Sequence, residues 1–190
     1  NIDYCEIGFR FFNNNGFKGS CAFTSEEFLC SLTIPKNIRI AIMINANELI
    51  YDGELALDRL KKLIPVKASQ SKVDMIRVAC HSEIIEQILP VFEFLHDYGY
   101  IVCCNITQIS DKTIEKLEEL SSLLSSTKVD ILYFADSLGS STPSSIKKIV
   151  NALRINWPRQ LGIHAHNNTG LALSNTLQAI ECGVEWVDST

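Results

Sequence analysis

Two histidines near the end of the chain have a spacing that suits a metal site. His164 and His166 lie in residues 162–170 (GIHAHNNTG), where an apolar run typical of a strand gives way to a helix start. Residues two apart on a strand point to the same side, so both imidazoles project from the carboxyl end of that strand. Imidazole nitrogens bind divalent metals, and a carboxylate from elsewhere could complete the site. The alternative is a pair of hydrogen-bonded histidines in the protein core.

Two further segments place polar side chains at the ends of strands. Asp136 and Ser137 follow the apolar residues 131–135. We expect Asp136 to act in catalysis by orienting a metal ligand, and Ser137 to offer its hydroxyl or backbone N–H to a substrate carboxylate. The alternative is an Asp-Ser turn before a helix, which is common in α/β proteins. Asn105, at the end of an earlier strand, is either a substrate contact or a loop cap.

Charged residues flank the end of the strand predicted at residues 2–9. Glu6 is a candidate catalytic group that handles a proton or a metal-bound water, and Arg10 could hold an anionic substrate. An ordinary structural ion pair is the alternative for Arg10. Arg77 lies within an apolar strand and either points inward or belongs to the outer layer. An inward-pointing arginine must be paired because burying it alone is costly. Glu6 is a suitable partner for it.

The elements that must position these residues alternate between strand and helix. Strands are predicted at residues 2–9, 38–44, 73–79, 100–105, 129–135, 160–165 and 184–187. Helices are predicted at residues 55–64, 82–98, 111–121, 143–153 and 170–182, with another starting at Thr24 or Ser25. Pro90 predicts a kink or a division in the helix at 82–98, and Asp111 lies near the predicted start of its helix. Nearly continuous apolar strands are typical of a parallel sheet covered by helices on both faces.

A (β/α)8 barrel fits this pattern better than a doubly wound open sheet. Residues 6–10 (EIGFR) do not form the glycine-rich phosphate turn that usually follows the first strand of an open sheet. Barrels build their active sites from residues at the carboxyl ends of many strands. Such residues here are Glu6, Arg10, Asn45, His81, Asn105, Asp136, His164, His166 and Asp188. Because seven strands are predicted rather than eight, we expect one TIM-barrel domain over residues 1–190 that covers about strands 2 to 8 and is incomplete at both ends.

The composition excludes several classes of partner. The 190 residues carry a net charge of −5, which argues against nucleic acid or an anionic membrane surface as a partner. The apolar runs fall far short of the roughly 20 residues that span a bilayer. The seven cysteines include no C-x-x-C pair, which predicts reduced, buried thiols in a cytoplasmic protein rather than a disulfide framework.

Four segments carry a family resemblance: residues 6–10 (EIGFR), 76–81 (IRVACH), 136–139 (DSLG) and above all 164–172 (HAHNNTGLA). In these segments the sequence resembles the metal-dependent pyruvate aldolase and lyase superfamily of HMG-CoA lyase-like TIM barrels. The similarity is nearest to the 4-hydroxy-2-oxovalerate aldolase-like branch and extends over essentially the whole chain.

The resemblance implies a divalent cation, chiefly Mn²⁺ or Mg²⁺ and otherwise Co²⁺ or Zn²⁺, held by His164, His166 and an aspartate on the first barrel strand. In the family that aspartate belongs to an Asp-Arg-Glu or Asp-x-x-x-Arg-Asp-Gly signature, which also supplies a catalytic arginine. This sequence contains neither signature. Either both residues lie upstream of Asn1, or the chain is not catalytically competent.

The implied activity is that of an aldolase or lyase that cleaves or forms a carbon–carbon bond next to a 2-keto acid through pyruvate enolate chemistry. Two alternatives stay open: a synthase that condenses an acyl-CoA with a keto acid, and a non-catalytic barrel used for binding or assembly. The expected partners are a small-molecule 2-keto acid and either a second copy of the chain or a dehydrogenase.

Overall fold

The computed structural model describes residues 2–189, and its main element is a seven-stranded sheet. The strands are β1 (Tyr4–Phe9), β2 (Arg39–Asn45), β5 (Met75–Cys80), β6 (Ile101–Ile106), β7 (Ile131–Asp136), β8 (Gln160–Ala165) and β9 (Trp186–Val187). Their order in the sheet is the same as their order in the chain. Sequential order with a helical crossover between parallel neighbours is the arrangement expected of a barrel, whereas a doubly wound sheet reverses its order at a switch point.

Helices connect the strands. They are α1 (Glu26–Ser31), α2 (Leu57–Leu63), α3 (Ile85–Asp97), α4 (Ile114–Ser125), α5 (Pro143–Arg154) and α6 (Ala172–Glu181). Short 3-10 turns lie at η1 (Ala46–Leu49), η2 (Ala68–Gln70), η3 (Ser82–Ile84) and η4 (Ile109–Asp111). No helix in residues 2–189 is both long and apolar enough to cross a membrane.

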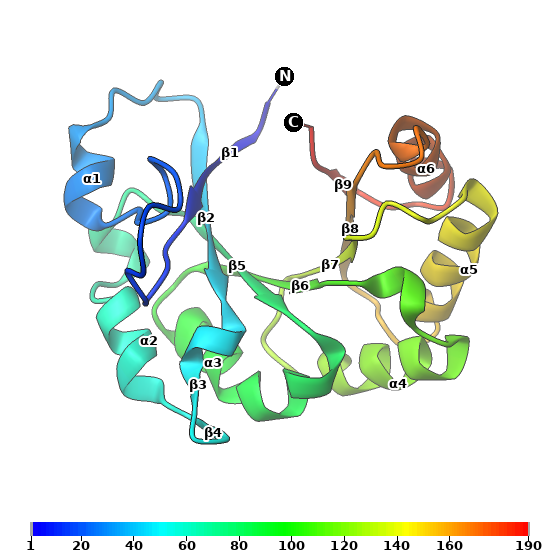
Figure 1. Ribbon diagram of the computed structural model, residues 1–190, viewed down its shortest axis with the longest axis horizontal. Helices are drawn as coiled ribbons and strands as arrows, with labels where there is room; N and C mark the ends of the chain where they lie inside the picture. Colours follow the sequence, from blue (N-terminus) through cyan, green and yellow to red (C-terminus); the bar gives the residue numbers. More distant parts are fainter. Residues whose placement is uncertain (1, 190) are drawn as a thin grey trace. The chain divides into compact units, whose positions relative to one another are not determined.

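The chain forms two compact units, Asn1–Cys103 and Cys104–Thr190. In the first unit β1, β2 and β5 pair in parallel, with Glu6 opposite Ala41 and Met43 opposite Arg77. Helices α1, α2 and α3 belong to this unit (Figure 1). An antiparallel hairpin of β3 (Ile50–Tyr51) and β4 (Glu54–Leu55), which the sequence pattern did not predict, precedes α2.

The second unit carries the two histidines. Strands β7, β8 and β9 pair in parallel, and α4, α5 and α6 pack in succession beside them (Figure 1). Helix α5 shows how the sequence sets this packing: Ile146, Ile149 and Leu153 are buried, whereas Lys147 and Lys148 face solvent. Three- and four-residue spacing of apolar side chains puts them on one side of a helix.

Three details differ from the sequence predictions. Helix α3 runs unbroken through Pro90, so a division of the helix there was wrong. Pro90 is exposed, so the carbonyl that loses its partner can bind water instead. The N-cap of α4 is Thr113, whose hydroxyl accepts a hydrogen bond from the Lys116 N–H, and Asp111 lies in η4. All seven cysteines are thiols in the structure, but only Cys80, Cys103 and Cys104 are buried.

Candidate functional site

The two histidines at the end of β8 turn their rings toward each other. The Nε2 atoms of His164 and His166 are 3.1 Å apart, and the ring planes are inclined by 72°. The shared side of the strand that was predicted from the two-residue spacing is therefore observed. The His164 side chain is 28% exposed and His166 is more open, so a small ligand can reach both rings from solvent.

A carboxylate holds the outer nitrogen of His164. Asp188, just after β9, places Oδ2 2.7 Å from the His164 Nδ1. The backbone N–H of Asp188 donates to the Ile163 carbonyl at 3.3 Å, and Val187 pairs with Ile163 across the two strands. The register between β8 and β9 thus sets the contact. Sequence reasoning placed Asp188 at a strand end but gave it no role.

The geometry of the two Nε2 atoms suits a metal ion. Nitrogens bound about 2.0–2.1 Å from one ion at angles of about 90–110° are about 2.8–3.4 Å apart. The observed separation of 3.1 Å lies within that range. Within residues 2–189, however, no group of three or more His, Cys, Asp or Glu side chains converges on one point. The described part of the chain therefore offers two ligand atoms, the Nε2 nitrogens of His164 and His166. Asp188 contacts the other ring nitrogen of His164, Nδ1.

Asp136 does not share the face of the histidines. Ala135 pairs with His164 and Asp136 with Ala165, so Asp136 points to the opposite side of the sheet. Its carboxylate is fully buried and accepts hydrogen bonds from the N–H groups of Ser140 (3.2 Å) and Ser141 (3.0 Å). These contacts match the turn-forming alternative. The carboxylate that orients a histidine is that of Asp188.

Ser137 and Asn105 also lie in the second unit. The Ser137 hydroxyl accepts a hydrogen bond from the Gln108 N–H at 3.1 Å and so joins the loops that follow β6 and β7. Gln108 has a positive φ of 54°, an uncommon backbone conformation that this contact helps to hold. Asn105 is buried at the end of β6. Substrate binding by either residue stays a prediction.

The loop that follows His166 is braced against the loop that follows β7. Asn168 Nδ2 donates to the Leu138 carbonyl (2.9 Å), and the Thr169 hydroxyl donates to the Gly139 carbonyl (2.8 Å). The loops approach so closely that a Cβ on Gly139, where φ is +60°, would lie 2.9 Å from the Cβ of Asn168. These contacts restrict the motion of the backbone next to His166.

Comparison with known proteins assigns the chain to a family. The family model described as HMGL-like matches residues 25–190, which include both histidines and Asp188. This chain belongs to the HMGL-like family. The family resemblance noted in the sequence is thereby confirmed.

Two curated relatives of this HMGL-like chain carry the names of lyases. The chain is 29% identical over 124 residues to a 4-hydroxy-2-oxovalerate aldolase of Bacillus thuringiensis, covering 65% of this chain and 36% of the relative. It is 25% identical over 191 residues to an oxaloacetate decarboxylase of Mycobacterium tuberculosis, covering 100% of this chain and 53% of the relative. The chain thus spans about a third to a half of the length of these two relatives. The relatives carry the names of enzymes that make or break carbon–carbon bonds.

A solved structure supports the fold class. The N-terminal domain of a candidate aldolase from Bacteroides vulgatus superposes with a TM-score of 0.82 at 26% identity, covering 100% of this chain and 60% of that one. Together with the sequential order of the parallel strands, this confirms the prediction of a partial (β/α)8 barrel.

The first unit of the HMGL-like chain pairs Glu6 with Arg77. Glu6 Oε2 lies 3.0 Å from Arg77 Nη1, and the arginine side chain is only 6% exposed. The need for a partner, predicted from the position of Arg77 in an apolar strand, is met by the residue expected. Glu6 keeps 29% of its side chain exposed, and its catalytic role stays a prediction.

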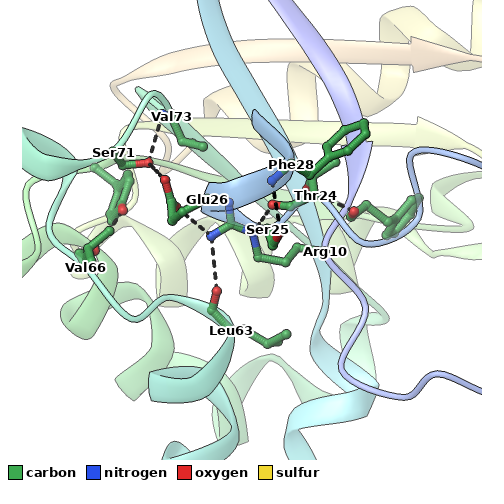
Figure 2. A network of polar contacts seen from close by, with 11 residues as sticks. Arg10, Thr24, Ser25, Glu26, Phe28, Leu63, Val66, Ser71 and Val73 are labelled. Carbon is green, nitrogen blue, oxygen red and sulfur yellow. Dashed lines mark hydrogen bonds and ion pairs between the residues drawn. The ribbon is translucent and has the colours of Figure 1, made fainter. Parts of the chain in front are cut away.

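Arg10 belongs to a buried network in the same unit (Figure 2). Its guanidinium lies 3.0 Å from Glu26 Oε1 and donates to the carbonyls of Thr24 and Leu63. Glu26 in turn accepts a hydrogen bond from the Ser71 hydroxyl at 2.9 Å. Burial lowers the pKa of Arg10, while the charge of Glu26 and the hydrogen bond with it oppose that shift. The contacts match the structural alternative for Arg10, because they join β1 to the start of α1 and the end of α2.

Proposed function

We propose that this chain forms part of a divalent-metal-dependent aldolase or lyase that cleaves or forms the carbon–carbon bond next to a 2-keto acid. The observation that carries the proposal is the convergence of the His164 and His166 Nε2 atoms, 3.1 Å apart, at the carboxyl end of a parallel strand. Mn²⁺ and Mg²⁺ are the ions we expect first.

His164 and His166 would hold the ion through their Nε2 atoms. The hydrogen bond between Asp188 and the His164 Nδ1 would keep the His164 ring from rotating. A bound divalent ion supplies Lewis-acid chemistry, because it withdraws charge from the carbonyl of a 2-keto acid as the adjacent bond breaks. The braced loops beside His166 hold these donors in place, and well-positioned groups lower the barrier by avoiding reorganisation during the reaction.

The names of the relatives support a 2-keto acid as the substrate. One is named a 4-hydroxy-2-oxovalerate aldolase and the other an oxaloacetate decarboxylase, and both names designate 2-oxo acids. Decarboxylation is therefore the second candidate activity, favoured by a match that extends over the whole chain. The family resemblance implies an aspartate as the third protein ligand, and within residues 2–189 no carboxylate joins the two Nε2 atoms.

Metal binding by the full-length gene product is the first test. We expect titration calorimetry to detect Mn²⁺ binding, and we expect either His164→Ala or His166→Ala to weaken it more than the roughly 10–100-fold that loss of an outer hydrogen-bond partner costs. His96→Ala is the matched control, because His96 is a half-exposed histidine on α3 in the other unit, and it should leave the affinity unchanged.

Activity distinguishes the candidates. Pyruvate release from several 4-hydroxy-2-keto acids indicates the aldolase, and CO₂ release from oxaloacetate indicates the decarboxylase. Both should stop on chelation and return with Mn²⁺. A protein that ignores added Mn²⁺ contradicts both enzyme functions and leaves the non-catalytic barrel.

A further inference from the structure

We propose that Asp188 is a positioning residue that sets the proton positions of both histidines, and that His166 exchanges the nitrogen carrying its proton when a cation binds. The first part concerns the protein without metal. The second part rests on the proposed function.

Asp188 determines the tautomer of His164. An ionised carboxylate only accepts hydrogen bonds, so the 2.7 Å contact requires a proton on the His164 Nδ1. A neutral imidazole carries one N–H and one bare nitrogen. The Nε2 of a neutral His164 is therefore a lone-pair donor, which is the form a metal ligand needs.

The tautomer of His166 follows from that of His164. The two Nε2 atoms are 3.1 Å apart, a distance typical of a hydrogen bond, and such a bond needs one proton between them. Because the His164 Nε2 is the acceptor, a neutral His166 must donate from its own Nε2 and keep Nδ1 bare. His166 thus donates from Nε2 to the His164 Nε2, and His164 donates from Nδ1 to Asp188.

A cation cannot bind to this arrangement as it stands. Two-point binding needs both Nε2 lone pairs, and in the metal-free pair the His166 Nε2 bears a proton. That proton leaves Nε2 for water as another arrives from water at the His166 Nδ1, so the net charge of the pair does not change. The exposed ring of His166 permits this exchange with solvent. His164 keeps its proton at Nδ1, where Asp188 accepts it.

The two histidines therefore differ in role. His164 is set for metal binding in advance, since its acceptor is already in place. His166 has to change its tautomer. Without a cation, the proton on the His166 Nε2 lies between the two rings, where a cation would bind. Loss of the Asp188 carboxylate would remove the preference of His164 for the Nδ1–H tautomer. Through the hydrogen bond between the rings, it would also remove the preference of His166 for the Nε2–H tautomer.

Nitrogen NMR of the full-length gene product, labelled with ¹⁵N at histidine, tests the tautomers directly. Spectra are recorded at about pH 8.5, above the range in which imidazole usually titrates, and signals are assigned with single His→Ala variants. In the metal-free protein we expect His164 as the Nδ1–H form and His166 as the Nε2–H form. Adding diamagnetic Zn²⁺ should convert His166 to the Nδ1–H form and leave His164 unchanged.

Variants separate Asp188 from its neighbours. The amide introduced by Asp188→Asn can either accept from or donate to the His164 Nδ1, so we expect mixed tautomers and Zn²⁺ affinity about 10–100-fold weaker. Asp188→Ala should give mixed tautomers as well. Glu185→Gln is the matched control: Glu185 lies on the same segment and accepts from the Leu161 N–H of β8, yet it does not touch either histidine. It should change neither readout.

The outcomes tell this proposal apart from the proposed function. If His166 already carries its proton on Nδ1 without metal, or if His164 keeps its tautomer in Asp188→Ala, the positioning role is wrong. If the wild-type protein binds Zn²⁺ and Asp188→Asn binds it equally tightly, the positioning role fails while the proposed function stands. If the wild-type protein binds no cation, the proposed function and the exchange at His166 both fail, while the metal-free spectra still decide the role of Asp188.

Discussion

Gly162 lies against the ring of Tyr133, which leaves no room for a side chain at position 162. The two residues pair across β7 and β8, and a Cβ at position 162 would lie 2.5 Å from both Cε1 and Cζ of Tyr133 and 2.6 Å from Cδ1. Carbon atoms in favourable contact are about 3.5–4.0 Å apart, so three ring carbons overlap by about 1 Å. Tyr133 is buried, and its ring cannot move away without displacing the core around it.

We expect Gly162→Ala to lower the free energy of unfolding by about 2 kcal/mol. Overpacking of a core costs about 1–3 kcal/mol, and an overlap with three carbons of a buried ring belongs at the upper end. Against this, replacing glycine by alanine reduces the entropy of the unfolded chain and restores about 0.4–1 kcal/mol. Residues two apart on a strand share a face, so the Tyr133 ring lies on the side of β8 that carries His164, and its displacement should also disturb the histidine pair.

A double-mutant cycle measured by urea unfolding tests the cause. Tyr133→Val removes the three overlapping carbons, so Gly162→Ala should be neutral or slightly stabilising in that background, with a coupling energy of about 2–3 kcal/mol. If Gly162→Ala costs the same in both backgrounds to within about 0.5 kcal/mol, overlap with the Tyr133 ring is not the cause of the destabilisation.

Two further predictions concern the buried network of the first unit. Arg10→Met should lower the free energy of unfolding by about 2–3 kcal/mol, below the 3–5 kcal/mol typical of a broken buried pair because Glu26 keeps 24% of its side chain exposed. Lys116→Met, which removes an exposed ion pair, is the control and should cost under about 1 kcal/mol. If the two variants are equally stable and Arg10→Met raises the KM for the keto acid, Arg10 binds substrate instead. The Tyr100 hydroxyl donates to the Val66 carbonyl at 2.8 Å, and burial raises the pKa of Tyr100. The protonated hydroxyl therefore contributes its full stability below the unfolded pKa of about 10, and this contribution is lost as the pH rises through the folded pKa. Urea midpoints between about pH 8 and 11 should therefore fall more steeply for the wild type than for Tyr100→Phe, and parallel curves would contradict the shift.

Local patterns in the sequence predicted much of the fold. The bounds of β8, Gln160–Ala165, agree with the predicted strand because parallel strands buried on both faces leave continuous apolar runs. The convergence of His164 and His166 was also predictable, since the alternation of side chains along a strand depends on the backbone alone. Helix α5 was predicted for a similar reason, with Pro143 in its first turn.

Contacts between distant residues were not predictable in this way. Asp136 and Arg10 both follow apolar strands and therefore resembled residues of an active-site rim. The register of β7 against β8 turns Asp136 away from the histidines, and the packing of α1 and α2 encloses Arg10. Neither register nor helix packing leaves a signature in a short window of sequence, because both join residues that are far apart in the chain. The two carbonyls that Arg10 contacts, for example, lie 14 and 53 positions away from it.

The alternation of strands and helices, like the family and the pair of imidazoles on one side of β8, follows from side-chain periodicity and from residues adjacent in the chain. Which carboxylate contacts those imidazoles depends on the folded sheet. The Asp188 carboxylate reaches His164 across 24 residues through the pairing of β8 with β9, and a hydrogen bond between two strands exists only once both have taken their places in the sheet.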